Sequence, residues 1–406
     1  MSDINRVSVR LNLRGANQKI GEIVRDDSSY YFQYTTDYLL NGSNISPFKL
    51  KWTNEIQQAN TAVFGGLFGV FADSLPDGWG RLLIDRTLRQ RGTNLDEINE
   101  LDRLTYVGKN GLGALTYHPI HEDQSSLTPN FNLDALAIEA SNVLKGESTE
   151  ALEELVRLGG SSGGARPKIM IGYNPGTDVI VSGQEVLPFG FDHWIIKFPA
   201  MIDPPDVANI EYAYHRMAVR AGLIMSECRL FTGASGRQYF GTKRFDRVGN
   251  DRLHLHSAAG LFHDNFRSTN IDYGNVMHAA FKLSGRDSTA YDQVLRLAAF
   301  NVLAHNHDDH SKNISFLMDA KKNWKLAPAY DLTFSRSQHG YQSMSVAGNS
   351  KPTAKNIFAL AEDFDVKDGQ QIVDEVETAI NTWDELASTY DLSKSSATEI
   401  SGTITK

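Results

Sequence analysis

The sequence predicts an α+β fold with a β-rich N-terminal domain, followed by two lobes of which the C-terminal one is largely helical. Three observations support this prediction. Residues 7–13 alternate in hydropathy like one face of a β-strand, and a dense glycine cluster at 159–164 precedes a run of short apolar strands. Residues 291–305 instead keep the apolar period of a helix.

The changes in composition and hydropathy pattern along the chain also suggest domain boundaries. We expect a β-rich domain at 1–120, a linker or helical connection at 121–150, a lobe with the glycine-rich loop at 151–250 and a helical lobe at 251–406. A chain of 406 residues is too long for one ordinary domain, which agrees with this division.

Composition excludes several classes of protein. Hydrophobic residues make up 41% of the chain, enough for a globular core, but no apolar stretch approaches about 20 residues, so no membrane association is expected. The N-terminus lacks the apolar region of a secretory signal, and Cys228 is the only cysteine, so we expect a cytoplasmic protein without intrachain disulfides. A net charge of −9 argues against direct binding of nucleic acid.

The elements of the first half follow from local pattern. In the segment 4–13, Val7, Val9, Leu11 and Leu13 share one face of a strand. The further elements expected here are strands at 30–34 and 111–118, a helix at 77–91 that ends before Gly92, a polar linker at 121–130, and helices at 133–144 and 149–158.

The second half alternates strands and helices before it becomes helical. The elements expected here are strands at 168–172, 194–198 and 238–242, helices at 209–221 and 291–305, a hairpin of 313–317 with 324–327, and tail helices at 353–364 and 369–390. Residues 393–406 are rich in Ser and Thr, and we expect them to fray.

The most informative segment is HNHDDHSKN, residues 305–313, between an apolar helix and a strand. Asp308 and Asn313 have the Asp-x-x-x-x-Asn spacing of the catalytic loop of protein kinases. This chemistry needs a carboxylate that orients an attacking hydroxyl and an amide oxygen that binds Mg²⁺ in the same cleft. The hairpin that follows would return Asp331 to this cleft as a second metal ligand, although Leu332 and Thr333 replace the usual Phe-Gly, which argues against an ordinary activation loop.

A lysine in an apolar strand is the second informative feature. Lys197 lies in HWIIKFP, where an unpaired charge would be costly, and Glu211 on the following helix could pair with it. The glycine-rich segment GGSSGGARPK precedes this strand, and its backbone N–H groups could approach phosphate oxygens. It is not a Walker A motif, because Ala165 stands where that motif has its lysine.

These motifs occur in kinase order, and together the chain resembles the HipA family, the serine/threonine kinase toxins of bacterial toxin–antitoxin pairs. The matching stretches are LPDGWGR (75–81), GGSSGGARPK (159–168), IIKFP (195–199), NIEYAYHRMAVRAGL (209–223), KRFDR (243–247), FNVLAHNHDDHSKNISFL (300–317) and LAPAYDL (326–332).

The resemblance implies a bilobal, protein-kinase-like domain after the N-terminal domain, with ATP and Mg²⁺ as cofactors. Asp308 would be catalytic, Asn313 and Asp331 would hold the metal, and Glu211 would pair with Lys197. The implied ATP contacts are Gly160, Ser161, Ser162, Gly163, Gly164, Lys197, Lys243, Arg244, Phe245, Asp246, His310 and Lys312. Ser161 matches a serine that the family autophosphorylates in its glycine-rich loop, although the adjacent Ser162 leaves the register open.

The resemblance also implies partners: a small helix-turn-helix antitoxin, and a protein substrate such as an aminoacyl-tRNA synthetase or another translation factor. Three alternatives remain open on the residues. His305, His307, Asp309 and His310 fit the His-x-His-x-Asp-His motif of a metallo-β-lactamase-like zinc hydrolase. The spacing Asp308-x-His310-x-x-Asn313 also resembles a phosphoinositide kinase, and a catalytically silent fold could serve only to bind an antitoxin.

Overall fold

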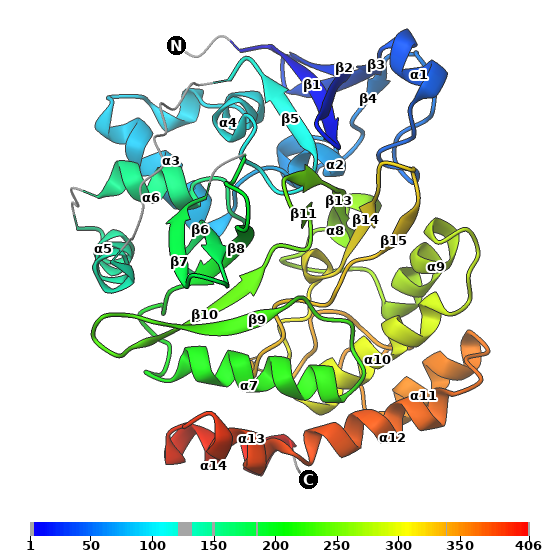
Figure 1. The fold of residues 1–406 in the computed structure, drawn as a ribbon. Coiled ribbons are helices and arrows are strands. Elements are labelled where there is room, and N and C mark those ends of the chain that lie inside the picture. Colours follow the sequence, from blue (N-terminus) through cyan, green and yellow to red (C-terminus); the bar gives the residue numbers. More distant parts are fainter. Residues whose placement is uncertain (1–3, 121–131, 148–150, 184–185, 338, 405–406) are drawn as a thin grey trace.

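The computed structural model describes residues 4–120, 132–147, 151–183, 186–337 and 339–404. The polar linker expected at 121–130 lies outside the described residues. The fold is α+β, with a β-rich N-terminal domain followed by a two-lobed domain whose last part is helical, as the sequence predicts (Figure 1). Among the described residues, no helix is long and apolar enough to cross a membrane.

The N-terminal sheet has five strands in the order β4-β3-β2-β1-β5. Its strands are β1 (Arg6–Leu13), β2 (Ala16–Asp26), β3 (Ser29–Tyr34), β4 (Gln57–Gln58) and β5 (Leu115–His118). The helices beside them are α1 (Thr36–Asn41), α2 (Gly69–Ala72), α3 (Gly78–Gln90) and α4 (Glu100–Val107). The alternation in β1 is confirmed, because Val7, Val9 and Leu11 are buried while Ser8 and Arg10 between them are partly exposed.

The second sheet lies beside the first and has the order β7-β6-β8-β10-β9. Its strands are β6 (Lys168–Asn174), β7 (Val179–Ser182), β8 (Asp192–Lys197), β9 (Cys228–Thr232) and β10 (Gln238–Lys243). The helices around it are α5 (Leu133–Lys145), α6 (Leu152–Gly159) and α7 (Val207–Arg220). Trp79 and Leu83 of α3 belong to the core of this sheet, so a helix from the N-terminal segment is built into the second lobe.

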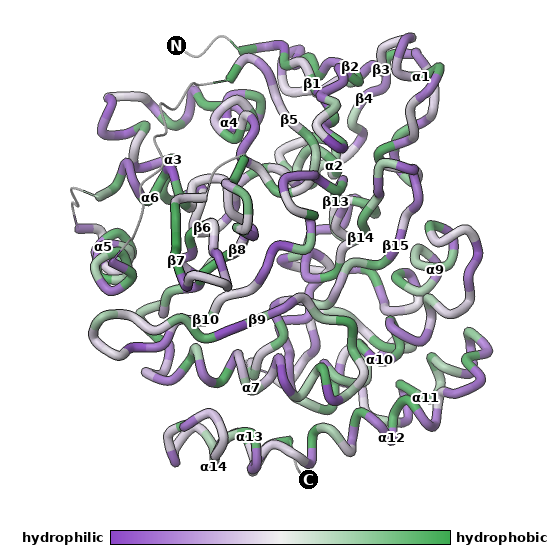
Figure 2. Tube along the Cα trace, viewed as in Figure 1, coloured by the Kyte–Doolittle hydropathy of each residue, from purple (hydrophilic) through white to green (hydrophobic). Residues whose placement is uncertain are grey.

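The last lobe packs around the buried helix α10. Its helices are α8 (Ala258–Phe262), α9 (Tyr273–Leu283), α10 (Ala290–Leu303), α11 (Ala354–Asp363), α12 (Gly369–Ile380), α13 (Trp383–Thr389) and α14 (Lys394–Ile404). Its short strands are β11 (Arg247–Val248), β12 (Asp251–Arg252), β13 (His254–Ser257), β14 (Ser315–Met318) and β15 (Trp324–Leu326). Figure 2 shows hydrophilic and hydrophobic residues alternating along α11 and α12, as helices with one buried face require.

Two expectations for the tail are wrong. The single helix expected at 369–390 is two helices, because the chain turns after α12 and brings Trp383 against Tyr214 with the ring centroids 5.4 Å apart. Residues 394–404 form α14 rather than fraying. Asp206 accepts hydrogen bonds from the Ser393 N–H at 2.8 Å and the Ser396 hydroxyl at 3.0 Å, so tertiary contacts hold a segment whose composition alone is weak.

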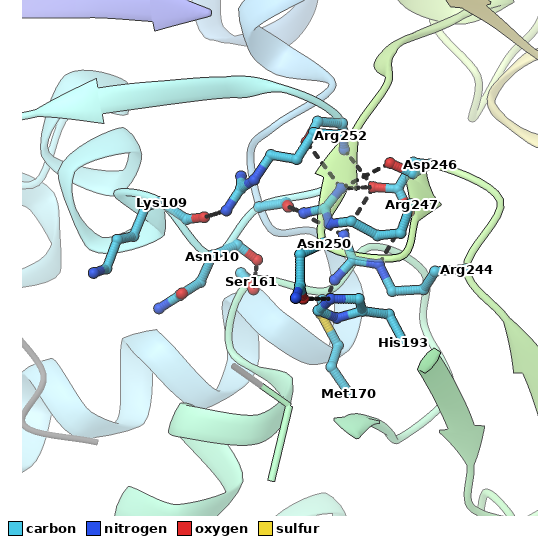
Figure 3. A network of polar contacts seen from close by, with 12 residues as sticks. Lys109, Asn110, Ser161, Met170, His193, Arg244, Asp246, Arg247, Asn250 and Arg252 are labelled. Carbon is cyan, nitrogen blue, oxygen red and sulfur yellow. Dashed lines mark hydrogen bonds and ion pairs between the residues drawn. The ribbon is translucent and has the colours of Figure 1, made fainter. Parts of the chain in front are cut away.

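Buried polar contacts join the N-terminal domain to the rest of the chain. Asp246 pairs with Arg244 and Arg247, and the guanidinium of Arg247 also donates to the carbonyl groups of Gly111 and Gly113 (Figure 3). This network fixes the segment just before β5 against the second lobe.

A second buried junction involves His256, whose Nδ1 lies 2.6 Å from Asp73 and whose Nε2 lies 2.9 Å from the Ser46 hydroxyl. The order of groups is that of a Ser-His-Asp triad, but Ser46 is only 1% exposed. A substrate therefore has no access to this hydroxyl, and the contact serves to join the two domains.

Candidate active site

Lys197 is the last residue of β8, and its ammonium forms ion pairs with two carboxylates. One belongs to Glu211 of α7, which is 4% exposed, and the other belongs to Asp331 in the segment after β15. The expected lysine–glutamate pair is therefore present, and the hairpin returns Asp331 to the lysine as anticipated. A buried ammonium needs such partners, because an unpaired charge in this position would be strongly destabilising.

The charged groups in this cluster stabilise one another's ionised forms. Burial alone would lower the pKa of Lys197, but Asp331 and Glu211 outweigh that effect and raise it. Burial would likewise raise the pKa of Asp331, but the ammonium groups of Lys197 and Lys168 hold it well below the usual range for a carboxyl. Both Lys197 and Asp331 are therefore charged at neutral pH.

The catalytic-loop candidate begins where α10 ends. His305 has φ 51° and Asp331 has φ 55°, both in the left-handed region that non-glycine residues seldom adopt. Such conformations often occur at functional sites, where the surrounding structure maintains them. Two residues of the expected site therefore adopt this conformation, as do several others elsewhere in the described chain.

Within this loop, Asn313 Nδ2 donates to the backbone carbonyl of Asp308 at 2.9 Å. This bond fixes the amide, and within the described residues no hydrogen bond engages its Oδ1. The Asp308 carboxylate projects into solvent, with 70% of the side chain exposed, and lies 4.0 Å from His310 Nε2. Partial desolvation and the nearby charge of Asp331 raise the pKa of Asp308, while His310 opposes the shift.

Direct contacts thus join Lys197, Glu211 and Asp331, and the loop joins Asp308, His310 and Asn313. Hydrogen bonds hold the loop against the segment that carries Asp331: the Asp308 N–H donates to the Ser335 hydroxyl at 3.0 Å, and the Tyr330 hydroxyl donates to the Lys312 carbonyl at 2.7 Å. His310 Nδ1 is shielded from solvent without a hydrogen-bond partner among the described residues. Carboxylate and amide oxygens are the ligands that Mg²⁺ prefers, so Asp331 and the Oδ1 atom of Asn313 fit such an ion.

The glycine-rich loop connects α6 to β6. Ser162 is 2% exposed and its hydroxyl donates to the Gly159 carbonyl at 2.6 Å, whereas the Ser161 hydroxyl donates to the Asn110 carbonyl at 2.8 Å (Figure 3). Gly164 has φ 84°, a conformation in which other residues are strained. The loop serines therefore differ: Ser162 is buried and bonded within the loop, whereas Ser161 is partly exposed and bonded to the N-terminal segment.

Lys168 is a site residue that the sequence analysis missed. It is the first residue of β6 and pairs in register with Lys197 of β8, so the two lysines stand opposite each other on neighbouring antiparallel strands. Burial lowers the pKa of Lys168, and Asp331 partly restores it. The two lysines therefore lie side by side next to the carboxylates of Asp331 and Glu211, and only the strand register, which no local pattern gives, brings them together.

The residues of the segment 243–246 make two kinds of contact. Lys243 forms an ion pair with Asp192 at 2.6 Å, and the Phe245 ring lies 5.2 Å from that of Tyr330. The side chains of Arg244 and Asp246 are instead turned into the buried network of Figure 3. Any nucleotide contact of those two residues would therefore come from their backbone.

Lys312, the remaining expected ATP contact, forms an ion pair with Asp77 at the start of α3. Its ammonium also lies 5.0 Å from the centre of the Phe266 ring. Sequence analysis gave no role to Asp77, because its partners lie far away along the chain.

The contacts of the histidine-rich loop count against a zinc site. Asp309 is turned inward, where it accepts from the Tyr273 hydroxyl and the Ser343 N–H, both at 2.9 Å. His307 Nδ1 accepts from the Ser337 N–H at 3.2 Å. Within the residues that the structure covers, no group of three His, Cys, Asp or Glu side chains is placed to hold a metal ion.

The fold and the site together define a two-lobed, kinase-like protein with an additional β-rich N-terminal domain. The chain belongs to the HipA family. Residues 160–383 match the HipA-like C-terminal domain, and residues 11–118 match the HipA N-terminal domain.

Individual relatives agree with this assignment. Two proteins of Sinorhizobium fredii, Y4dM and Y4mE, bear names that class them provisionally as kinases. Y4dM is 29% identical over 34% of this chain and 36% of its own length. Y4mE is 25% identical over 66% of this chain and 63% of its own length. The chain thus spans less than two thirds of either relative. A solved chain from the HipA, HipB and operator DNA complex of Shewanella oneidensis has the same fold, with a TM-score of 0.67, 18% identity, and coverage of 98% of this chain and 95% of that one.

Proposed function

We propose that this chain is an ATP-dependent serine/threonine protein kinase of HipA type, which transfers the γ-phosphate of ATP to a protein hydroxyl. The observation that carries the proposal is the double ion pair of Lys197 with Glu211 and Asp331. A lysine that is fixed by a helix carboxylate and faces a metal-binding carboxylate is the arrangement that phosphoryl transfer requires. The family and the kinase names of the two relatives support it.

Each residue has a distinct role in the proposed reaction. The ammonium of Lys197, with that of Lys168 beside it, would hold the phosphate oxygens. Asp331 and Asn313 would hold Mg²⁺, which neutralises the charge that develops on the transferred phosphoryl group. The exposed Asp308 carboxylate would orient the protein hydroxyl and take its proton. Most of the rate gain would come from this positioning and charge stabilisation.

We also propose that the kinase phosphorylates its own glycine-rich loop at Ser161. The different surroundings of the two serines favour Ser161 over Ser162, which is buried and engaged with Gly159. The test is incubation with labelled ATP and Mg²⁺, alone and with a cell lysate, followed by mass spectrometry. We expect label on lysate proteins and on Ser161. The label on the loop should be lost in Ser161→Ala but not in Ser162→Ala. Absence of transfer from ATP to any hydroxyl would refute the proposal.

As a toxin, the chain would act with a partner. The Shewanella relative is named as part of a complex with HipB and operator DNA. We propose that this chain similarly binds a small helix-turn-helix antitoxin, and that the antitoxin makes the DNA contacts, since the chain carries a net charge of −9. An aminoacyl-tRNA synthetase or another translation factor is the substrate class to test first. Mobility-shift assays should show operator binding only when the antitoxin is present.

A further inference from the structure

Asp77 joins three segments that are distant in sequence. It precedes α3 as the N-cap residue, yet its side chain makes no hydrogen bond to its own helix. One carboxylate oxygen instead accepts from the Gly164 N–H in the glycine-rich loop, and the other pairs with the ammonium of Lys312 in the catalytic loop. An aspartate at an N-cap ordinarily bonds to the first turn of its helix, so these contacts replace its usual role.

The segment around Asp77 also holds the loop through its backbone. The Trp79 N–H donates to the Gly164 carbonyl at 2.9 Å, so both backbone polar groups of Gly164 are bonded to the start of α3. The packing is close enough to need glycine: a Cβ on Gly80 would lie 2.5 Å from the carbonyl oxygen of Ser162 and 2.8 Å from that of Gly160. The start of α3 and the glycine-rich loop are therefore fitted to each other.

The charges at this junction are matched. The Asp77 side chain is 15% exposed and that of Lys312 is 20% exposed. Burial would raise the pKa of Asp77, but the ammonium of Lys312 and the Gly164 N–H outweigh it and hold the pKa below its usual value. Asp77 is thus an anion at neutral pH, and its loss would leave Lys312 without this counter-ion.

We propose that Asp77 is a positioning residue that clasps the glycine-rich loop to the catalytic loop and so holds the two loops in place around the proposed phosphate site. The loop is bonded to the N-terminal segment at three points: the Ser161 hydroxyl to Asn110, the Gly164 N–H to Asp77, and the Gly164 carbonyl to the Trp79 N–H. Without Asp77, the half of the loop next to Lys168 keeps only the Trp79 bond and loses its link to Lys312 of the catalytic loop, while the serine end remains bound. The effect on catalysis rests on the proposed kinase function, whereas the effect on the loop does not.

The first test measures hydrogen exchange in the protein without nucleotide. Asp77→Ala removes both contacts, and Asp77→Asn keeps an acceptor for Gly164 but removes the charge. Exchange of residues 160–166 should accelerate about tenfold or more in Asp77→Ala, the effect of losing a charge-assisted hydrogen bond, and less in Asp77→Asn. Strands β8 and β10 should remain protected as in the wild type. Glu154→Gln is the matched control, because it breaks an ion pair with Arg157 at 3.2 Å on the helix that leads into the loop.

The second test separates binding from chemistry. Asp77→Asn should raise KM for ATP about fivefold or more with a smaller fall in kcat, and Asp77→Glu should recover part of the loss. The effects of Asp77→Asn and Lys312→Gln should not add, because both break one ion pair. Unchanged loop exchange in Asp77→Ala would overturn the clasp, as would tighter ATP binding in Asp77→Asn, which would mean that the carboxylate competes with phosphate. Accelerated exchange in a protein without phosphotransfer would sustain the clasp and refute the kinase proposal.

Discussion

Replacing Lys197 by methionine tests the ion-pair cluster at the centre of the site. The change keeps a long apolar side chain on β8 but removes the ammonium that faces Glu211 and Asp331. Glu211 is 4% exposed, and removing one partner of a buried ion pair typically destabilises a protein by about 3–5 kcal/mol. Because the Asp331 side chain is 36% exposed and keeps some solvation, we expect the lower end, about 3 kcal/mol.

The loss should also depend on pH. In the wild type the pKa of Asp331 is depressed, so its contribution to stability is present above the pKa of the unfolded carboxyl and is lost as the pH falls through the folded value. Removing Lys197 removes the largest charge that lowers this pKa, so this contribution shrinks. The stability gap between wild type and Lys197→Met should therefore be larger at pH 7 than at pH 2.

Urea denaturation of both proteins at several pH values measures this gap. Lys243→Met is the matched control, since its ion pair with Asp192 lies on the same sheet but both side chains are about one third exposed. Such a pair contributes about 0–1 kcal/mol, so the control should lose little. A loss below about 1 kcal/mol in Lys197→Met, or equal losses in the two variants, would refute the reasoning about this cluster.

Three further predictions concern other parts of the molecule. Burial raises the pKa of Asp309 to about 7, so near this pH the folded state binds a proton that the unfolded state does not. The free energy of unfolding of the wild type should therefore rise by about 1.4 kcal/mol from pH 8 to pH 6, relative to that of Asp309→Asn. Urea titrations in which the two proteins show the same pH dependence would contradict this. Lys168→Met should weaken ATP binding by about tenfold in calorimetry, and undiminished binding would exclude Lys168 from the phosphate site. The variant should not lose stability, because burial of this ammonium is unfavourable, as its lowered pKa indicates. Asp246→Ala should destabilise the chain by about 3–5 kcal/mol in denaturant titrations, since Arg244 and Arg247 lose a buried partner, and a loss within 1 kcal/mol would contradict that role.

The parts that could be predicted from sequence are those in which local pattern and tertiary environment agree. The alternation of β1 indicates one buried face, the apolar residues of α10 indicate a helix in the core, and both elements form where expected. The pairing of Lys197 with Glu211 could be anticipated because a buried strand lysine needs a partner on a neighbouring element.

The remaining features depend on contacts between distant residues. Asp77 meets Gly164 across 87 positions and Lys312 across 235, so no local window contains the clasp. Lys168 joins Lys197 only through the register of β6 with β8. The helix α14 forms in a Ser- and Thr-rich tail because Asp206 bonds to its start and Ile400 and Ile404 are buried. In each case tertiary contacts override a weak local signal.

The most direct test of the proposed mechanism is phosphoryl transfer by Asp308→Asn. This carboxylate is exposed and makes no buried ion pair, so the variant should fold and bind Mg²⁺ and ATP with an affinity within about threefold of the wild type. Transfer of labelled phosphate to Ser161 or to a protein substrate should fall by about 100-fold or more, the usual contribution of a general base. Transfer at the wild-type rate would show that Asp308 is not the catalytic base and would contradict the account of this cleft.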